Sequence, residues 1–144
     1  MSILHFCDEE PAVVHPEATV ADAIQVMVER HVGAAAVVDG NSVVGIFTER
    51  DVLRKLALSG LNPVRTPVKE FMSTPVETIT PATSAGDAFA TMIGHHFRHL
   101  PVVDRTGKLL RILSIRNLLQ AQVEELRQQL DSLEQYVTND SFGG

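Results

Sequence analysis

Thr48 and Asp51 are the two residues whose types and spacing best suit ligand binding in this sequence. An apolar, β-rich run at 43–47 ends at Thr48, and residues 49–58 then carry apolar side chains at helical spacing. At such a strand-to-helix junction a threonine caps the helix, and the unpaired amide groups favour a phosphate. The Asp51 carboxylate can accept hydrogen bonds from a vicinal ribose diol. An ordinary helix cap explains the same two residues, so the junction alone leaves both interpretations open.

The composition is that of a soluble globular protein of about one domain. The 144 residues are 44% apolar and 21% charged, with a net charge of −6. Because no basic block is present, the chain offers no general surface for nucleic acid or an acidic membrane. Cys7 is the only cysteine, which excludes an internal disulfide and favours a reducing compartment. With no leader-like start and no run of membrane length, the sequence predicts a cytoplasmic protein.

The first part of the sequence, residues 8–60, predicts a β-α-β-β-α unit. Its predicted elements are a strand at 12–15, a helix at 20–31, strands at 34–38 and 43–47, and a helix at 49–58. Thr19 is the expected N-cap of the first helix, with Asp22 three residues later, and Gly33 is expected at its end. The two later strands are joined by a turn at 39–41.

The same unit recurs 65 residues further on, which is the strongest signal in the sequence. This offset pairs Asp22 with Asp87 and Met27 with Met92; one extra residue in the later hairpin turn raises it to 66. Residues 61–75 are then a linker and the start of the second repeat, and 76–120 are the second repeat. Since each half is too small to bury its own faces, the predicted fold is α/β (α+β), with tandem repeats packed as a pseudo-two-fold pair.

A C-terminal helix at 121–138 is predicted to extend beyond the second repeat. Apolar residues recur along it at alternating gaps of four and three, starting just before its first residue: Leu119, Val123, Leu126, Leu130, Leu133 and Val137. About two and a half heptads are too few for a stable coiled coil alone. The narrow seam favours pairing in a homodimer, although a helix lying on its own domain stays open. Residues 139–144 are expected to be a flexible tail.

The doubled unit resembles the CBS domain, named for cystathionine β-synthase, in the stand-alone pair called a Bateman module. Three segments carry the resemblance: GIFTERD at 45–51, HLPVVD at 99–104 and MSTPV at 72–76. The resemblance covers about residues 13–120. It implies that the repeats pack through their sheets and leave two related clefts, which in this family commonly bind adenosine ligands such as AMP, ADP, ATP, S-adenosylmethionine or NAD.

One nucleotide site is implied where the first repeat matches the family pattern of glycine, two apolar residues, Thr or Ser, any two residues, and Asp. Its expected residues are Gly45, Thr48, Asp51, Arg98, His99 and Pro101. Thr48 would contact phosphate and Asp51 the ribose hydroxyls. Arg98 and His99, from the opposite repeat, would add two potential cations, while an ordinary surface ion pair is the alternative for Arg98.

The corresponding site of the second repeat is expected to be weak or empty. Arg111 stands in place of the glycine, Ser114 at the Thr or Ser position and Asn117 in place of the aspartate. The substitution by Asn117 removes the charge-assisted hydrogen bond to ribose. Gly33 and Ala34, which are expected to face this site, add no charge to it.

The predicted function is a regulatory module that senses an adenosine nucleotide, AMP or ATP first, and signals to a protein target through the conformation of its homodimer. A ligand-free scaffold for protein interactions is the alternative. Catalysis is not expected, because no nucleophile and base are visibly paired. No metal or required cofactor is expected either, since His95, His96 and His99 lack a fourth ligand nearby.

Overall fold

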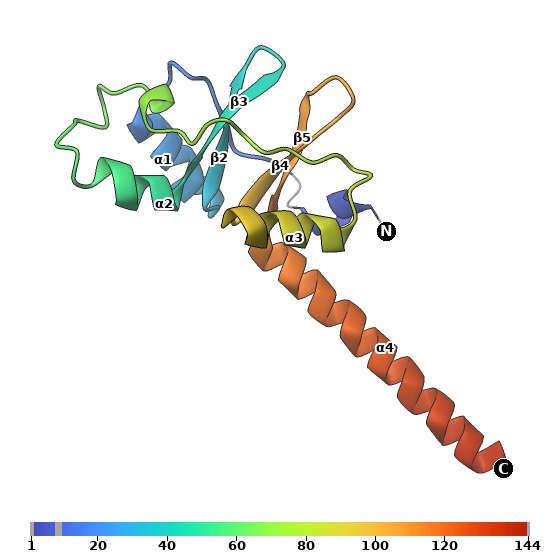
Figure 1. The fold of residues 1–144 in the computed structure, drawn as a ribbon. Helices are drawn as coiled ribbons and strands as arrows, with labels where there is room; N and C mark the ends of the chain where they lie inside the picture. Colours follow the sequence, from blue (N-terminus) through green and yellow to red (C-terminus); the bar gives the residue numbers. More distant parts are fainter. Residues whose placement is uncertain (1, 8–9, 144) are drawn as a thin grey trace.

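Two small α/β halves and one long helix make up the protein (Figure 1). The computed structural model describes residues 2–7 and 10–143, with side chains up to Thr138. The first half contains η1 (Ile3–Phe6), β1 (Val13–Val14), α1 (Val20–Arg30), β2 (Ala34–Asp39), β3 (Ser42–Thr48), α2 (Glu49–Asp51) and the π-helical turn η2 (Val52–Leu56). The second contains η3 (Val68–Glu70), α3 (Ala85–His95), β4 (His99–Val103), β5 (Leu109–Ser114) and α4 (Ile115–Gly143).

The sheet of the first half has the strand order β1-β2-β3. β1 runs parallel to β2, and β2 runs antiparallel to β3 with Ala34 opposite Thr48. Thr19 caps α1 through reciprocal bonds with Asp22, which confirms that prediction. The expected role of Gly33 as the helix end is wrong, because His31 closes the helix with a left-handed φ of 55°.

The second half repeats this plan with a smaller sheet of two strands, β4 and β5. Its expected first strand is reduced to one parallel bridge between Ile79 and Val102. Both hairpins carry a shift of register at the same place, between Val37 and Val38 and, 65 positions later, between Val102 and Val103. The internal repeat is therefore present in detail in the backbone.

Each half has its own hydrophobic core. Each core also contains a short helix that belongs to the other half in the sequence. Val68 and Phe71, around η3, pack into the first core, whereas Ile3 of η1 packs into the second. Ile3 and Val68 are 65 positions apart and equally buried, so η1 and η3 are equivalent segments that the repeats exchange. The structural repeat thus begins near residue 3, and Val68 and Phe71, from the segment predicted to hold the linker and the start of the second repeat, belong to the first core.

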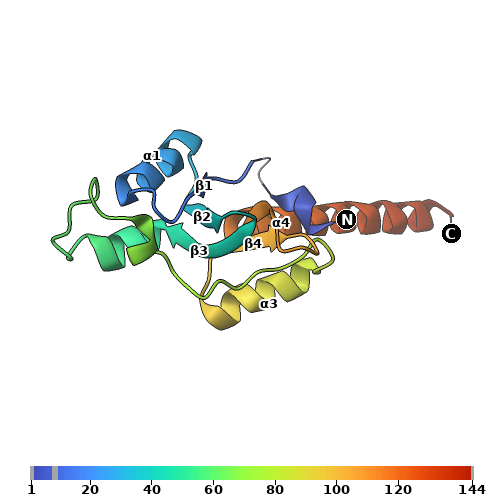
Figure 2. The same ribbon diagram turned by 90° about the horizontal axis from the view of Figure 1, so that it is seen from above.

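The connector between the halves continues past η3 along the edge of the first sheet. The Ser73 amide donates to the Ile46 carbonyl at 2.7 Å, and the Ile46 amide donates back at 3.1 Å. The chain then crosses to the second half and enters α3, which lies on the opposite side of the strands from α1 (Figure 2). Ser73 therefore lies at the boundary of the two halves.

The helix α4 joins the last predicted helix of the second repeat and the predicted C-terminal helix into one element of 29 residues. A helix of that length measures about 43 Å, and most of it extends away from the two halves (Figure 1). It continues to Gly143, beyond the predicted limit at residue 138. The six seam residues named above are between 43% and 60% exposed, so about half of the seam's surface faces solvent.

Candidate nucleotide site

The junction of β3 and α2 is closed by reciprocal hydrogen bonds between Thr48 and Asp51. The Asp51 amide donates to the Thr48 hydroxyl at 3.3 Å, and the Thr48 amide donates to Asp51 Oδ2 at 3.0 Å. The Thr48 hydroxyl also donates to Oδ2, at 3.2 Å. These bonds form a capping box, which satisfies amide groups that a helix start leaves unpaired. The predicted cap is therefore confirmed.

A cleft of about 340 Å³ opens beside this junction and is lined by residues of both halves. Five of the six residues predicted for the stronger site line it: Thr48, Asp51, Arg98, His99 and Pro101. Gly45 does not. It is buried in β3, where an added Cβ would overlap the side chain of Met72, so its missing side chain makes room for packing rather than for a ligand.

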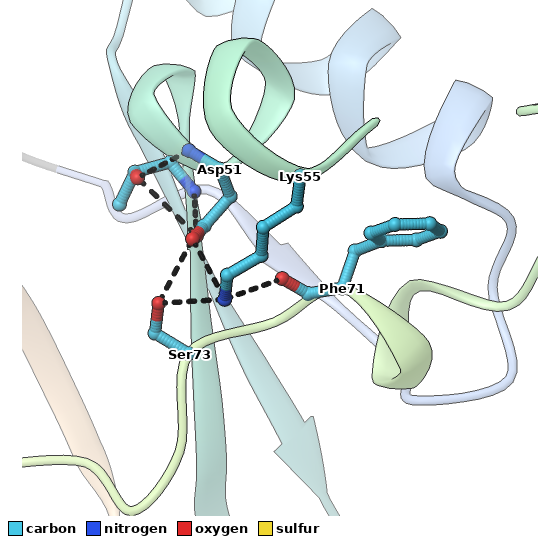
Figure 3. Close-up of polar contacts among 5 residues, drawn as sticks. Asp51, Lys55, Phe71 and Ser73 are labelled. Atoms are coloured by element: carbon cyan, nitrogen blue, oxygen red, sulfur yellow. Dashed lines mark hydrogen bonds and ion pairs between the residues drawn. The ribbon is translucent and has the colours of Figure 1, made fainter. Parts of the chain in front are cut away.

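The Asp51 side chain is 6% exposed and binds four donors (Figure 3). Oδ2 accepts from the amide and the hydroxyl of Thr48. Oδ1 accepts from the Ser73 hydroxyl at 2.9 Å and lies 3.0 Å from the Lys55 ammonium. Lys55 also donates to the Phe71 carbonyl at 3.1 Å, which fixes the ammonium between helix and connector. Sequence reasoning missed both Lys55 and Ser73.

His99 is a neutral group in the cleft, not the cation that the sequence suggested. Burial, and to a smaller extent the nearby positive charges of Arg98 and Arg50, together lower the pKa of His99 from 6.5 to about 4. A neutral imidazole keeps one donor and one acceptor nitrogen, so His99 can hydrogen-bond a base or a hydroxyl. The positive charge of this wall comes from the arginines.

Two further arginines, Arg50 and Arg54, line the cleft, and sequence reasoning did not assign them to it. Arg50 Nη1 crosses the cleft and donates to the His96 carbonyl at 2.9 Å. The Arg54 side chain makes no hydrogen bond or ion pair with any described residue and is exposed. Helical spacing offered a signal for Arg54, which follows Asp51 by three positions and shares its face. With Arg98, they give the cleft three cations, which suit an anionic ligand where they lie apart from the carboxylates of Glu49, Asp51 and Glu77 that line the same cleft.

The residues predicted for the weaker site, Ser114, Asn117, Gly33 and Ala34, line a second cleft of about 530 Å³. Ser114 caps α4 by accepting from the Asn117 amide at 3.1 Å, in the manner of Thr48. Gly33 and Ala34 add no charge to this second cleft, but other residues do. Arg98, His99 and Glu49 reach this cleft as well as the first one, and Arg116 and Glu10 also line it. Gly33 explains the sharing: its bare backbone leaves space for Glu49 and His99 at the wall between the clefts.

The chain belongs to the CBS domain family, whose pattern matches residues 3–58 and 68–124. The two matches begin 65 positions apart, at Ile3 and Val68, where the structure places the exchanged segments η1 and η3. A pair of CBS domains followed by a long helix is therefore the architecture of this chain.

Two curated relatives show the same relationship in sequence. An uncharacterized 17.7 kDa protein of Acidianus ambivalens is 39% identical over 110 residues, which are 76% of this chain and 65% of the relative. The mitochondrial CBS domain-containing protein CBSX3 of Arabidopsis thaliana is 35% identical over 124 residues, which are 83% of this chain and 60% of the relative. The chain spans less than two thirds of the length of either relative.

Two solved structures share the fold closely. A protein with CBS domains from Burkholderia ambifaria has 38% sequence identity and a TM-score of 0.76, covering 81% of this chain and 85% of its own. A CBS domain protein from Pyrobaculum aerophilum, solved in complex with AMP, has 26% identity and a TM-score of 0.77, covering 89% of this chain and 99% of its own.

Neither membrane nor metal features are found in the part of the chain that the structure describes. No helix there combines the length and the apolar composition needed to cross a bilayer. Among the same residues, no three His, Cys, Asp or Glu side chains are grouped to hold a metal ion. His95, part of the histidine cluster in the sequence, instead stacks on Phe97 with ring centroids 5.4 Å apart.

Proposed function

We propose that this protein is a regulatory module that binds an adenosine nucleotide in the cleft beside Thr48 and Asp51. The observation that carries the proposal is the lining of this cleft, in which a buried carboxylate from one half faces Arg98 and His99 from the other. The Pyrobaculum relative binds AMP, which supports an adenosine ligand. AMP and ATP are the first candidates; ADP, S-adenosylmethionine and NAD follow.

The cleft has the groups that such a ligand needs. The guanidinium groups of Arg54 and Arg98 suit phosphate oxygens, because planar, charged donors bind them in pairs. The Asp51 carboxylate suits the ribose hydroxyls. Ile46, Val76 and Pro101 give the cleft apolar surface for a base. We propose no catalytic step for this chain, since CBS pairs are typically regulatory.

The second part of the proposal is a homodimer that transmits the signal. The CBS halves and the exposed apolar seam of α4 would form its interface. A ligand that touches both halves changes the dimer only through a difference in its affinity for two arrangements of those halves. The Arg50 bond to the carbonyl of His96, which spans the same cleft, is one contact that such a ligand would strengthen or replace.

Thermal unfolding with AMP, ADP, ATP, S-adenosylmethionine and NAD tests the nucleotide site. A ligand at 100 times its dissociation constant adds about 2.7 kcal/mol of stability, which a melting curve resolves. Arg98→Ala should remove the shift, whereas Arg105→Ala, at an exposed hairpin turn outside the cleft, should keep it. Unfolding temperatures that none of the five ligands changes would contradict the nucleotide site.

A scaffold without a ligand is the second candidate. It is favoured by the state of Asp51, whose carboxylate already binds four donors of the protein itself. In that case the chain would dimerise through α4 and hold protein partners, and Asp51 would serve only the fold. The same ligand series separates the two functions, because the scaffold predicts dimerisation with no nucleotide response.

A further inference from the structure

The carboxylate of Asp51 has no acceptor position left for a ribose hydroxyl. Two carboxylate oxygens offer about four acceptor positions. Thr48 fills two of them on Oδ2, and Ser73 and Lys55 fill two on Oδ1. The side chain is 6% exposed, so it cannot turn toward solvent for more. A nucleotide that uses Asp51 must therefore displace one of these donors.

The three donor residues differ in how easily they can leave. The Thr48 amide and hydroxyl belong to the capping box that starts the helix. The Lys55 ammonium is also held by the Phe71 carbonyl at 3.1 Å and carries the charge that neutralises Asp51. Ser73 offers only a neutral hydroxyl, and Ser73 lines the cleft while Lys55 does not. Figure 3 shows Ser73 and Lys55 approaching the carboxylate from the connector and from the helix.

Lys55 follows Asp51 by four positions, the spacing at which side chains of one helix face pair. Lys55 lies in the π-helical turn Val52–Leu56, where the Ala57 amide donates to the Val52 carbonyl at 3.0 Å, five residues back. Such wide turns are rare and often occur at functional sites. Here the turn carries a lysine that contacts Asp51, Ser73 and the Phe71 carbonyl together, so the helix and the connector are tied at this one ammonium.

We propose that the Ser73 hydroxyl occupies the place of a ligand hydroxyl on Asp51 Oδ1, and that a bound nucleotide displaces it with a ribose hydroxyl. Lys55 is then a positioning residue, which stays in place and keeps the carboxylate oriented. This inference rests on the proposed nucleotide site and adds which group of the protein occupies Asp51 Oδ1 when no ligand is bound. The exchange replaces one neutral hydroxyl donor with another. The Ser73–Asp51 hydrogen bond therefore lowers the affinity for the nucleotide without changing the charge of the site.

Titration calorimetry with AMP and ATP tests the exchange on the full chain. Ser73→Ala removes the competing hydroxyl, so the nucleotide should bind about three- to tenfold more tightly than it binds the unaltered protein. The matched control is Thr74→Val, which removes the neighbouring hydroxyl of the same connector. Thr74 donates to the Val44 carbonyl at 3.2 Å and not to Asp51, so its loss should leave affinity unchanged.

The 2′,3′-dideoxy forms of the same nucleotides make the test specific to ribose. They bring no hydroxyl to Asp51, so Ser73→Ala should give them no gain in affinity. For Lys55, Lys55→Met should weaken nucleotide binding about tenfold, and Lys55→Arg should restore most of it. A residue with only a structural role would lower the unfolding temperature in both lysine variants without this difference in affinity.

The outcomes separate this inference from the nucleotide site itself. Unaltered protein that binds none of the five ligands of the unfolding series overturns both. Binding that Arg98→Ala removes, together with a Ser73→Ala variant of unchanged or weaker affinity, keeps the nucleotide site and overturns the exchange. An equal gain for ribose and dideoxy nucleotides also overturns it, because the Ser73 hydroxyl would then block the cleft by its bulk alone.

Discussion

Arg50 Nη1 donates to the main-chain carbonyl of His96 at 2.9 Å, a bond that joins the helix after β3 to the end of α3 across the cleft. His96 is the left-handed residue that closes α3, with a φ of 58°. Carbonyls at a helix end have no partner within the helix, so the guanidinium supplies one and also meets the negative end of the helix dipole. The two halves of the site are thus joined by a hydrogen bond between two residues that line the cleft.

Replacing Arg50 should loosen this junction without unfolding the protein. We expect Arg50→Met to lower the free energy of unfolding by about 1 kcal/mol, the usual size of a hydrogen bond that is partly exposed. Urea titration measures the loss. Arg54→Met is the matched control, since Arg54 lies on the same helix and makes no bond to a described residue, so its loss should be near zero. Equal losses in the two variants would show that the bond to His96 adds nothing.

The low pKa of His99 predicts that acid destabilises the protein. Between pH 6.5 and about 4, unfolded chains bind a proton at His99 while the folded protein does not, since burial holds its pKa at about 4. Stability therefore falls as the pH drops through this window, by about 3 kcal/mol in total from this residue.

Urea unfolding across that pH window, with His99→Gln as the comparison, isolates this contribution. Glutamine keeps a donor and an acceptor but binds no proton, so the fall in stability should be smaller in the variant by about the same amount. Titration of the His99 ring by NMR gives the pKa directly. A measured value near 6.5 would contradict the assigned cause, namely burial beside Arg98 and Arg50.

Local patterns in the sequence predicted much of this architecture because they act over a few residues. The Thr19 and Thr48 caps need only a carboxylate three positions later, and the repeat needs only a constant offset. The exchange of η1 and η3 between cores could not be read this way. Ile3 packs into the core of the second half, and Val68 packs into the core of the first. Apolar periodicity does not tell which core a short segment joins.

The same limit applies to the site. The resemblance of the repeats to a known family predicts that Thr48, Asp51, Arg98 and His99 share a cleft, and all four line the cleft of about 340 Å³. Ser73 reaches Asp51 from 22 positions away, through the bridge of the connector to Ile46, and no local pattern encodes that pairing. The neutral state of His99 was likewise out of reach, because it depends on burial in the folded chain.

Gly45 should prove a packing residue of the first half. We expect Gly45→Ala to cost about 1–3 kcal/mol of stability, because the new Cβ would lie 2.8 Å from Met72 Cγ, closer than side chains approach each other, and Met72 would have to move. Gly94→Ala is the control: it lies in α3 with no atom within 4 Å of the added Cβ, and alanine favours helix. Equal stability of the two variants, measured by thermal unfolding, would contradict the packing role.

The α4 seam makes a prediction about assembly. Its six apolar residues lie along a helix of about 43 Å and are roughly half exposed. A narrow apolar stripe of this kind is buried when the helix pairs with another helix. We expect sedimentation equilibrium to give a dimer, and Leu126→Glu to raise its dissociation constant at least about tenfold, because a carboxylate in the seam must be buried without a partner. Gln128→Glu adds the same charge two positions away, off the seam, and should leave the dimer intact. If both variants remain equally dimeric, the CBS halves alone hold the dimer, and α4 is left to another protein.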